Sequence, residues 1–221
     1  MYKAIINDLK TILFDFDGVV IDSEPLHAKA KKIVLDRFNI SYPQTIFDDY
    51  KGKTDKVFFD YVSSTLDKHR HNTDFLQNAK KSIFEEIIDE LKLIDGFLLF
   101  LEKMKKMGIR TALVSSTSLY SLALVDKKYN ISEMFDLVIT EVDTDLHKPY
   151  PDPYLKALEI LPASTESSVV IEDSPNGIIS AKKAGLFVYA LISSFQRNVL
   201  LEAGADEVVE NYIELTQKIN L

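Results

Sequence analysis

Short apolar runs rich in β-branched residues recur along the 221-residue chain, and they limit its possible folds more than any other feature. The segments between most of them carry apolar residues at the spacing of an amphipathic α-helix. Strands that alternate with helices are typical of βαβ units, so the pattern predicts an α/β fold with a parallel sheet. Runs such as Val169-Val170-Ile171 are apolar at every position, as expected of strands buried on both faces. The runs cover residues 11–14, 110–114, 137–140, 168–171 and 187–191, with a weaker one at 207–209.

Residues 22–92 interrupt this alternation, because they contain helical patterns and no buried strand. Thr54 is placed to cap a helix with one apolar face, formed by Val57, Phe58, Tyr61, Val62 and Leu66. A second apolar stripe comprises Phe75, Leu76, Ala79, Ile83, Ile87 and Leu91. We expect the two stripes to form the core of a small helical bundle, with the basic segment 68–71 as a solvated loop between the helices. A bundle inserted between the first two strands would form a cap over the strand ends, where ligands of open α/β sheets bind.

The composition excludes several classes of protein. The net charge of -8 disfavours nonspecific binding to nucleic acid or to an anionic membrane. The absence of cysteine excludes disulfides, thiolate metal sites and cysteine nucleophiles. The first residues lack the long apolar region of a signal peptide, and no segment has the length of a transmembrane helix. We therefore expect a cytoplasmic protein with no nucleic-acid or membrane partner, and a monomer by default.

Two of the apolar runs are each followed by a pair of carboxylates. Asp15 and Asp17 follow the first run, and both can face one site because residues two apart in a strand point the same way. Gly18 then allows the backbone to turn sharply. Glu172 and Asp173 follow a later run in the same manner. Carboxylates from two strand ends form a set of oxygen ligands suited to Mg²⁺. The alternatives at this point are an acidic turn for the first pair and a helix cap for one member of the second.

Two further segments carry groups that suit a phosphate. The run at 110–114 ends in Ser115-Ser116-Thr117-Ser118, whose hydroxyl and backbone N–H groups can bind an anionic oxygen at a helix start. Lys148 precedes Pro149, which restricts it to an extended conformation, and its ammonium can neutralise a phosphate or a bridging carboxylate. Each segment alone is weak evidence, since hydroxyl clusters commonly cap helices and Lys-Pro pairs occur in ordinary loops.

The four elements, in this order, resemble the signature motifs of the haloacid dehalogenase-like (HAD) superfamily. The matching segments are Phe14-Asp15-Phe16-Asp17-Gly18-Val19, Ser115-Ser116-Thr117, Lys148-Pro149-Tyr150-Pro151-Asp152-Pro153 and Glu172-Asp173-Ser174-Pro175-Asn176-Gly177. The resemblance spans essentially the whole chain and is to the helical-cap branch of phosphatases and β-phosphoglucomutase-like proteins. It implies a three-layer, Rossmann-like parallel-sheet core formed by residues 1–21 and 93–221, with residues 22–92 as an inserted α-helical cap domain.

The resemblance also implies roles for four catalytic residues. Asp15 would attack the phosphorus of a phosphomonoester and become an aspartyl phosphate. Asp17 would protonate the leaving oxygen and later take a proton from the incoming water. Ser115 and Lys148 would bind the transferring phosphoryl oxygens. Displacement of a halide needs no such acid, so Asp17 argues against dehalogenation.

A metal and substrate contacts are implied in the same way. Mg²⁺ would be bound by Asp15, the backbone carbonyl of Asp17, Asp173 and, in this branch, Glu172. The remaining candidates for substrate contacts are Ser116, His27 and Lys51.

The choice between hydrolysis and phosphoryl-group migration depends on the helical segment. His27 and the segment 51–54 resemble the corresponding parts of the mutases, but Asp55 stands where these have a phosphate-binding arginine. A carboxylate there would repel a second phosphate. We therefore expect a phosphatase that acts on a small phosphorylated metabolite. A sugar phosphomutase is the alternative, and a non-catalytic phosphate-binding module is a third hypothesis.

Overall fold

The computed structural model describes residues 9–50, 53–161 and 163–219. The chain divides into two compact units: a core unit, Met1–Asp22 with Lys92–Leu221, and a helical unit, Ser23–Leu91. The boundaries of the helical unit lie within one residue of those of the predicted insertion. The function of the helical unit as a cap stays a prediction.

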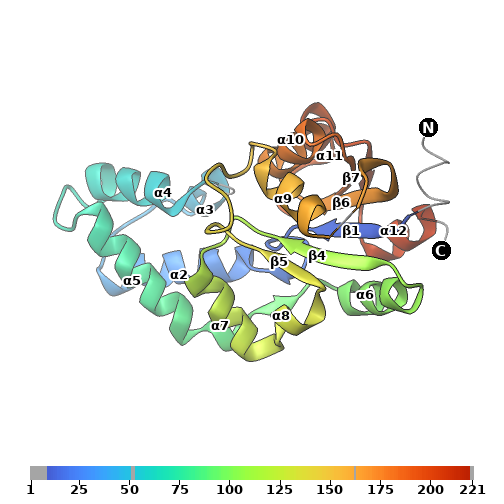
Figure 1. Ribbon diagram of the computed structural model, residues 1–221. Coiled ribbons are helices and arrows are strands. Elements are labelled where there is room, and N and C mark those ends of the chain that lie inside the picture. Colours follow the sequence, from blue (N-terminus) through green and yellow to red (C-terminus); the bar gives the residue numbers. More distant parts are fainter. Residues whose placement is uncertain (1–8, 51–52, 162, 220–221) are drawn as a thin grey trace. The chain divides into compact units, whose positions relative to one another are not determined.

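A six-stranded parallel sheet lies at the centre of the core unit (Figure 1). Its strand order is β5-β4-β1-β6-β7-β8. The strands are β1 (Thr11–Phe14), β4 (Arg110–Val114), β5 (Leu137–Ile139), β6 (Ser168–Glu172), β7 (Phe187–Leu191) and β8 (Glu207–Val209). Every strand coincides with one of the predicted runs to within one residue, and the predicted α/β fold is confirmed.

The central position of β1 creates a switch point in the sheet. Phe14 is in register with Leu113 of β4 on one side and with Ile171 of β6 on the other. The chain first adds β4 and β5 towards one edge and later β6, β7 and β8 towards the other. Ligands of open parallel sheets bind outside the carboxyl ends of the strands at such a point. The residues that follow β1, β4 and β6 therefore meet in one place.

Helices cover both faces of this sheet, which makes the core unit three-layered (Figure 1). On one face, α9, α10 and α11 pack on a buried apolar layer that includes Leu13, Val114 and Val170. On the other face, the Phe14 ring packs edge-on against Phe97 of α6. The helices of the core unit are α6 (Phe97–Lys106), α7 (Leu119–Tyr129), α8 (Ile131–Met134), α9 (Asp152–Ile160), α10 (Pro175–Lys183), α11 (Arg197–Glu202) and α12 (Tyr212–Lys218), with a 3-10 turn at Thr165–Ser167.

A short antiparallel ribbon joins the two places where the chain leaves and re-enters the core unit. It consists of β2 (Ile21–Asp22) and β3 (Lys92–Leu93). The Ile94 amide extends it by donating to the Val20 carbonyl at 2.9 Å. The sequence patterns do not predict this ribbon, because strands of two residues are too short to show a period. The ribbon ties both connections to the core unit.

The helical unit contains helices and no strand among its described residues. Its elements are α2 (Glu24–Arg37), α3 (Ile46–Asp49), α4 (Asp55–Tyr61), a π-helical turn (Val62–Leu66), α5 (Thr73–Glu86) and a 3-10 turn (Ile88–Glu90). Thr54 caps α4 as predicted, since its side chain accepts a hydrogen bond from the Val57 amide. None of the helices in the described part of the chain combines the length and the apolar character needed to cross a membrane.

Two residues of the predicted apolar stripes are exposed. Val57 is 48% exposed and Phe75 is 45% exposed, so the prediction is wrong for both. The adjacent residues Phe58 and Phe59 are both buried instead, so the buried face of α4 is rotated from the predicted stripe. Phe75 lies in the first turn of α5, where its ring packs against Phe38 rather than the interior.

Replacing Phe14 by alanine should strongly destabilise the core unit. Phe14 is completely buried, and its ring packs against three aromatic rings at centroid distances of 5.5, 6.0 and 6.1 Å. A cavity of this size lowers the free energy of unfolding by about 3–5 kcal/mol. Leu99→Ala is the control, because Leu99 is 76% exposed and its loss should cost less than about 0.5 kcal/mol. Urea unfolding of both variants measures the difference, and equal midpoints would contradict the packing.

Candidate active site

The carboxyl ends of three adjacent strands bring predicted catalytic residues together. Asp15 directly follows β1, Ser115 directly follows β4, and Glu172 is the last residue of β6. The backbone ladder fixes these positions, since the Asp15 amide donates to the Ile171 carbonyl and the Ser115 amide to the Ile139 carbonyl, both at 2.9 Å. Each side chain thus begins at a rigid strand end rather than on a mobile loop.

Lys148 reaches the same place from the loop that precedes α9. Its ammonium donates to Asp15 Oδ1 at 2.5 Å, to Glu172 Oε1 at 2.7 Å and to the Val114 carbonyl at 2.9 Å. All three of its N–H groups are therefore used. Burial lowers the pKa of Lys148, but Asp15 and Glu172 outweigh burial and hold this pKa well above its ordinary value. Lys148 is a fixed cation at the end of β1.

Glu172 is completely buried, and both of its carboxylate oxygens accept hydrogen bonds. Oε1 accepts from Lys148 and, at 3.0 Å, from the Tyr154 hydroxyl. Oε2 accepts from the Asp173 amide and from both the amide and the hydroxyl of Ser174, each at 3.0 Å. This carboxylate is thereby held in a single orientation.

Two glycines allow the backbone to approach these carboxylates closely. A Cβ atom at Gly177 would lie 1.5 Å from Glu172 Oε1, which no side chain permits. A Cβ atom at Gly18 would lie 2.0 Å from Asp173 Oδ2, and Gly18 also has a φ of +76°. Ser193 completes the surroundings of Asp173, because its hydroxyl donates to Oδ2. The turn predicted at Gly18 is therefore also a contact with the second acidic pair.

Asp15, Glu172 and Asp173 form a buried acidic group whose ligand atoms lie within 4.8 Å of one another. Burial and the charge of Glu172 raise the pKa of Asp15 to about 7, although Lys148 acts in the opposite direction. Burial and the charge of Asp15 raise the pKa of Asp173 well above its ordinary value. Three carboxylates face one ammonium, and a divalent cation would relieve their mutual repulsion. This group of hard oxygen donors therefore fits a divalent metal.

Asp17 lies beside the hydroxyl segment that follows β4. The Thr117 hydroxyl donates to Asp17 Oδ2 at 2.5 Å. The buried Ser115 hydroxyl accepts from the Thr117 amide at 2.9 Å, whereas Ser116 is exposed. Among the described residues, the Asp17 carboxylate is not part of the acidic group. The use of its backbone carbonyl as a metal ligand and the roles of Ser115 and Ser116 stay predictions.

The predicted substrate contacts of the helical unit are described only in part. His27 Nδ1 lies 2.8 Å from Lys80 Nζ, and its ring stacks on Phe84 with the centroids 4.5 Å apart. Lys51 lies outside the described residues. The proposed contacts of His27 and Lys51 with a substrate stay predictions.

Asp55 is not the isolated negative charge that the sequence suggested. Its carboxylate lies 2.7 Å from Lys80 Nζ and 3.3 Å from Lys31 Nζ, and both lysine side chains are less than 10% exposed. Burial raises the pKa of Asp55, but the two lysines outweigh burial and hold this pKa below its ordinary value. The Asp55 charge is compensated within the helical unit, so this carboxylate does not by itself distinguish a phosphatase from a mutase.

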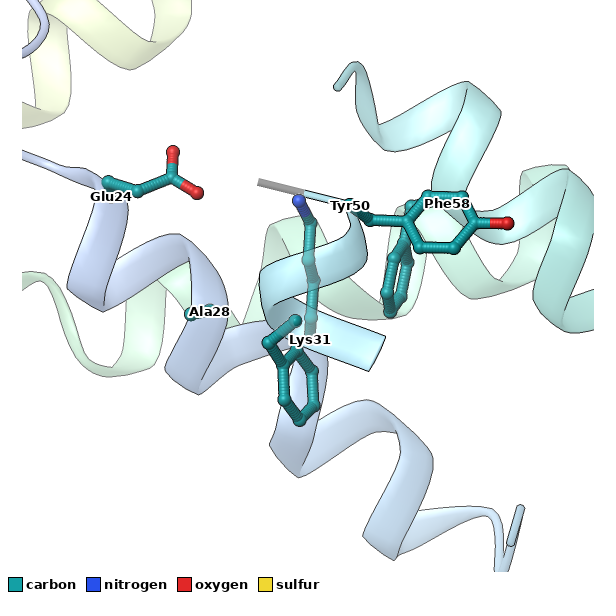
Figure 2. A pocket seen from close by; sticks show the side chains of 6 residues that line it. Glu24, Ala28, Lys31, Tyr50 and Phe58 are labelled. Carbon is teal, nitrogen blue, oxygen red and sulfur yellow. The ribbon is translucent and has the colours of Figure 1, made fainter. Parts of the chain in front are cut away.

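The helical unit also contains a small pocket (Figure 2). Lys31 lines this pocket and also belongs to the ion-pair group that it forms with Asp55 and Lys80. Figure 2 shows Lys31 reaching from α2 towards the aromatic side chain of Tyr50, with Glu24 on the opposite side. The lining residues are Glu24, Ala28, Lys31, Phe47, Tyr50 and Phe58. Its volume of about 10 Å³ is near the lower limit for one water molecule. The pocket is therefore too small to hold a metabolite.

Two residues that contact the site were not predicted from the sequence. Tyr154 lies in the first turn of α9, and Ser193 follows β7. Thr117 belongs to the predicted hydroxyl segment, but its contact with Asp17 was not predicted. Tyr154 and Ser193 carry no sequence signal, because only the packing of α9 and the end of β7 brings them to the carboxylates.

Comparisons with known proteins agree with this arrangement. Residues 12–191 match the family model of the haloacid dehalogenase-like hydrolases. The phosphorylated carbohydrates phosphatase of Thermotoga maritima is 30% identical over 208 residues, which are 91% of this chain and 94% of the relative. A solved structure of a candidate β-phosphoglucomutase from Thermotoga maritima has a TM-score of 0.80 at 28% identity, covering 96% of this chain and 97% of that one. CbbY from Rhodobacter sphaeroides, solved with phosphate, has a TM-score of 0.76 at 26% identity, covering 96% of this chain and 100% of that one.

A parallel sheet with an acidic pair at the end of its central strand, a lysine beside it and a second acidic pair on the next strand defines a class of hydrolases. The chain belongs to the haloacid dehalogenase-like hydrolase family. Its relative from Thermotoga maritima is named a phosphatase. The resemblance found in the sequence is thereby confirmed.

Replacing Gly177 by alanine should destabilise the protein, although the same change within a helix normally stabilises by about 0.5–1 kcal/mol. The new methyl group would overlap the Glu172 carboxylate, whose position is fixed by its hydrogen bonds. We expect a loss of about 1–3 kcal/mol in the free energy of unfolding. Asn176→Ala on the same helix is the control, since Asn176 is exposed. Urea unfolding measures both, and a stabilised Gly177→Ala variant would show that Glu172 does not occupy this position.

Replacing Asp55 by asparagine should destabilise the helical unit, because two buried lysines lose their shared carboxylate. We expect a loss of about 1–2 kcal/mol, which is less than for a fully buried pair because a third of Asp55 is exposed. Glu102→Gln is the control, because it breaks the exposed pair with Lys106. Thermal unfolding compares the two, and an unchanged midpoint for Asp55→Asn would argue against the ion-pair group.

Proposed function

We propose that the protein hydrolyses phosphomonoesters of small metabolites through an aspartyl phosphate formed on Asp15. The observation that carries this proposal is the 2.5 Å contact between Asp15 Oδ1 and the Lys148 ammonium at the end of β1. It combines a carboxylate nucleophile with a fixed cation that can bind phosphoryl oxygens. Membership of the family and the phosphatase relative support the proposal.

Asp15 presents its second oxygen to the phosphorus. Because Oδ1 is bound to Lys148, Oδ2 is the oxygen proposed to attack. A bond forms between Oδ2 and phosphorus while the bond to the leaving oxygen breaks. Lys148 and Ser115 bind the phosphoryl oxygens, where charge is concentrated in the transition state. On Lys148, a phosphoryl oxygen takes the place of one of the three acceptors present in this structure.

Asp17 is proposed to move the proton in both halves of the reaction. It protonates the leaving oxygen first and then takes a proton from the water that hydrolyses the aspartyl phosphate. The hydrogen bond from the Thr117 hydroxyl fixes the orientation of its carboxylate. The separation between the buried acidic group and Asp17 lets one carboxylate act as nucleophile and another as acid.

Mg²⁺ is the proposed metal, because the donors available are buried carboxylates. Asp15, Asp173 and the backbone carbonyl of Asp17 would hold it, with Glu172 beside them. When bound, Mg²⁺ supplies positive charge that offsets the repulsion between the anionic nucleophile and the anionic phosphoryl group. Ser193 would keep the Asp173 carboxylate in place for this purpose.

The proposed substrates are small phosphorylated metabolites, with sugar phosphates as the first class to test. The Thermotoga maritima relative is named for its action on phosphorylated carbohydrates. Ser116, His27 and Lys51 are the proposed substrate contacts.

A sugar phosphomutase is the second candidate function. The observation in its favour is the pairing of Asp55 with Lys31 and Lys80, which removes the charge argument against a second phosphate. The structural similarity to a candidate β-phosphoglucomutase points the same way. The two functions share the aspartyl phosphate and differ in whether water or a sugar hydroxyl accepts the phosphoryl group.

The purified protein should release phosphate from an aryl phosphate and from sugar phosphates in the presence of Mg²⁺. Asp15→Asn should lower kcat by at least about 10³-fold, because the nucleophile is lost, and EDTA should abolish turnover reversibly. Lys128→Met is a control outside the site. Turnover that survives Asp15→Asn, or that needs no metal, would contradict the mechanism.

The mutase is tested by product analysis in the same assay. Incubation with β-glucose 1-phosphate and a bisphosphate activator distinguishes glucose 6-phosphate from inorganic phosphate. Formation of glucose 6-phosphate faster than inorganic phosphate would reject the phosphatase proposal in favour of the mutase.

A further inference from the structure

Tyr154 contacts both partners of the ion pair between Lys148 and Glu172. It lies in α9 and is completely buried. Its hydroxyl donates to Glu172 Oε1 at 3.0 Å, and Lys148 Nζ lies 4.9 Å from the centroid of its ring. Burial, followed by the charge of Glu172, raises the pKa of Tyr154 well above its ordinary value, so the hydroxyl keeps its proton and acts as a donor.

Glu172 has no acceptor position left for a further partner. A carboxylate offers about four such positions. Lys148 and Tyr154 occupy Oε1, while the Asp173 amide and the amide and hydroxyl of Ser174 occupy Oε2. A metal ion on Glu172 would have to displace one of these donors. The hydrogen bonds therefore direct Glu172 towards Lys148 rather than towards the metal.

The position of the Lys148 ammonium depends on the exact place of Glu172 Oε1. Three acceptors surround that ammonium, and two of them, Asp15 and the Val114 carbonyl, are fixed by adjacent strands. The third is the oxygen that Tyr154 also binds. Without the hydroxyl, Oε1 would accept from Lys148 alone, and only the three hydrogen bonds to Oε2 would set its position.

We propose that Tyr154 is a positioning residue, whose hydroxyl holds Glu172 Oε1 so that Lys148 stays on Asp15 at the distance needed for phosphoryl transfer. This inference rests on the function proposed above. The acceptor count supports a corollary, namely that Glu172 orients Lys148 and that Asp15 and Asp173 are the carboxylates that bind the metal. A tyrosine that served only to fill the core would need its ring but not its hydroxyl.

Tyr154→Phe removes the hydroxyl and keeps the ring. We expect kcat to fall about tenfold, the order expected for one buried hydrogen bond to a charged group, while KM changes less than about twofold. Tyr212→Phe is the matched control, because Tyr212 is also a buried tyrosine and its hydroxyl donates to a backbone carbonyl, that of Val19. The control should keep kcat within about twofold while losing a comparable hydrogen bond.

A double-mutant cycle separates positioning of Lys148 from a loss of stability. In a Lys148→Met background, Tyr154→Phe should lower kcat by less than about twofold, because the group that it positions is gone. A reduction of the same size in both backgrounds, or an unchanged kcat for Tyr154→Phe alone, would overturn the proposal.

Two further measurements do not depend on turnover. In ¹⁵N-labelled protein, the Lys148 ammonium signal, identified by its loss in Lys148→Met, should shift or exchange faster with water in Tyr154→Phe and not in Tyr212→Phe.

Calorimetric Mg²⁺ titration should give the same Kd for Tyr154→Phe as for the unmodified protein, within about twofold, whereas Asp173→Asn should weaken binding at least about tenfold. An unchanged ammonium signal, or a loss of Mg²⁺ affinity as large as that of Asp173→Asn, would overturn the proposal. If the unmodified protein shows no phosphatase activity, the proposed function fails and the ammonium signal alone decides the inference.

Discussion

The Lys148 ammonium donates to Asp15, to Glu172 and to the Val114 carbonyl, so that groups at the ends of β1, β6 and β4 meet at a single nitrogen atom. Removing one partner of such a buried pair typically costs about 3–5 kcal/mol, because a charge is left uncompensated. The pairing is possible only because β1 lies between β4 and β6 in the sheet. The strand order that buries the apolar runs is thus the same order that brings the charges together, and folding and the proposed chemistry depend on one arrangement.

Close approach of the backbone is the second condition for this arrangement. The carboxylates of Glu172 and Asp173 occupy space that a Cβ atom would fill at Gly177 and Gly18. Neither carboxylate could occupy its place if the neighbouring glycine carried a side chain. The glycines therefore act less as flexible joints than as positions without a side chain, which let the Glu172 and Asp173 carboxylates pack directly against the backbone. Such contact lets a buried acid be fixed before any ligand arrives.

The sequence predicted the sheet well because each strand is a buried apolar run, and burial on both faces leaves a continuous signal. It also predicted Asp15, Glu172 and Asp173 at one edge, because parallel strands bring their carboxyl ends together, and the resemblance to the family motifs placed Lys148 beside them. Contacts made through tertiary packing left no such signal. Tyr154 reads as one more apolar position of α9, and its hydroxyl acquires a partner only when that helix packs on β6. The prediction for Val57 was wrong for a related reason: helical spacing alone does not fix which face of α4 packs inward, and Phe58 and Phe59 are buried in its place.

Asp55 shows how a charge can be misjudged when its neighbours are unknown. Its two lysines lie elsewhere in the helical unit, on α2 and α5, so no local pattern links them to it. In the core unit three buried carboxylates face one lysine, and burial together with the excess of acid raises the pKa of Asp15 and Asp173. In the helical unit the lysines Lys31 and Lys80 meet the carboxylate of Asp55, and Glu24 adds a second negative charge near Lys80. A divalent cation would relieve the repulsion among the carboxylates of the core unit. In the helical unit the opposite charges already balance, and the ion pairs connect α2, α4 and α5. The same residue types therefore form a ligand site in one unit and a structural contact in the other, and the balance of buried charge distinguishes them.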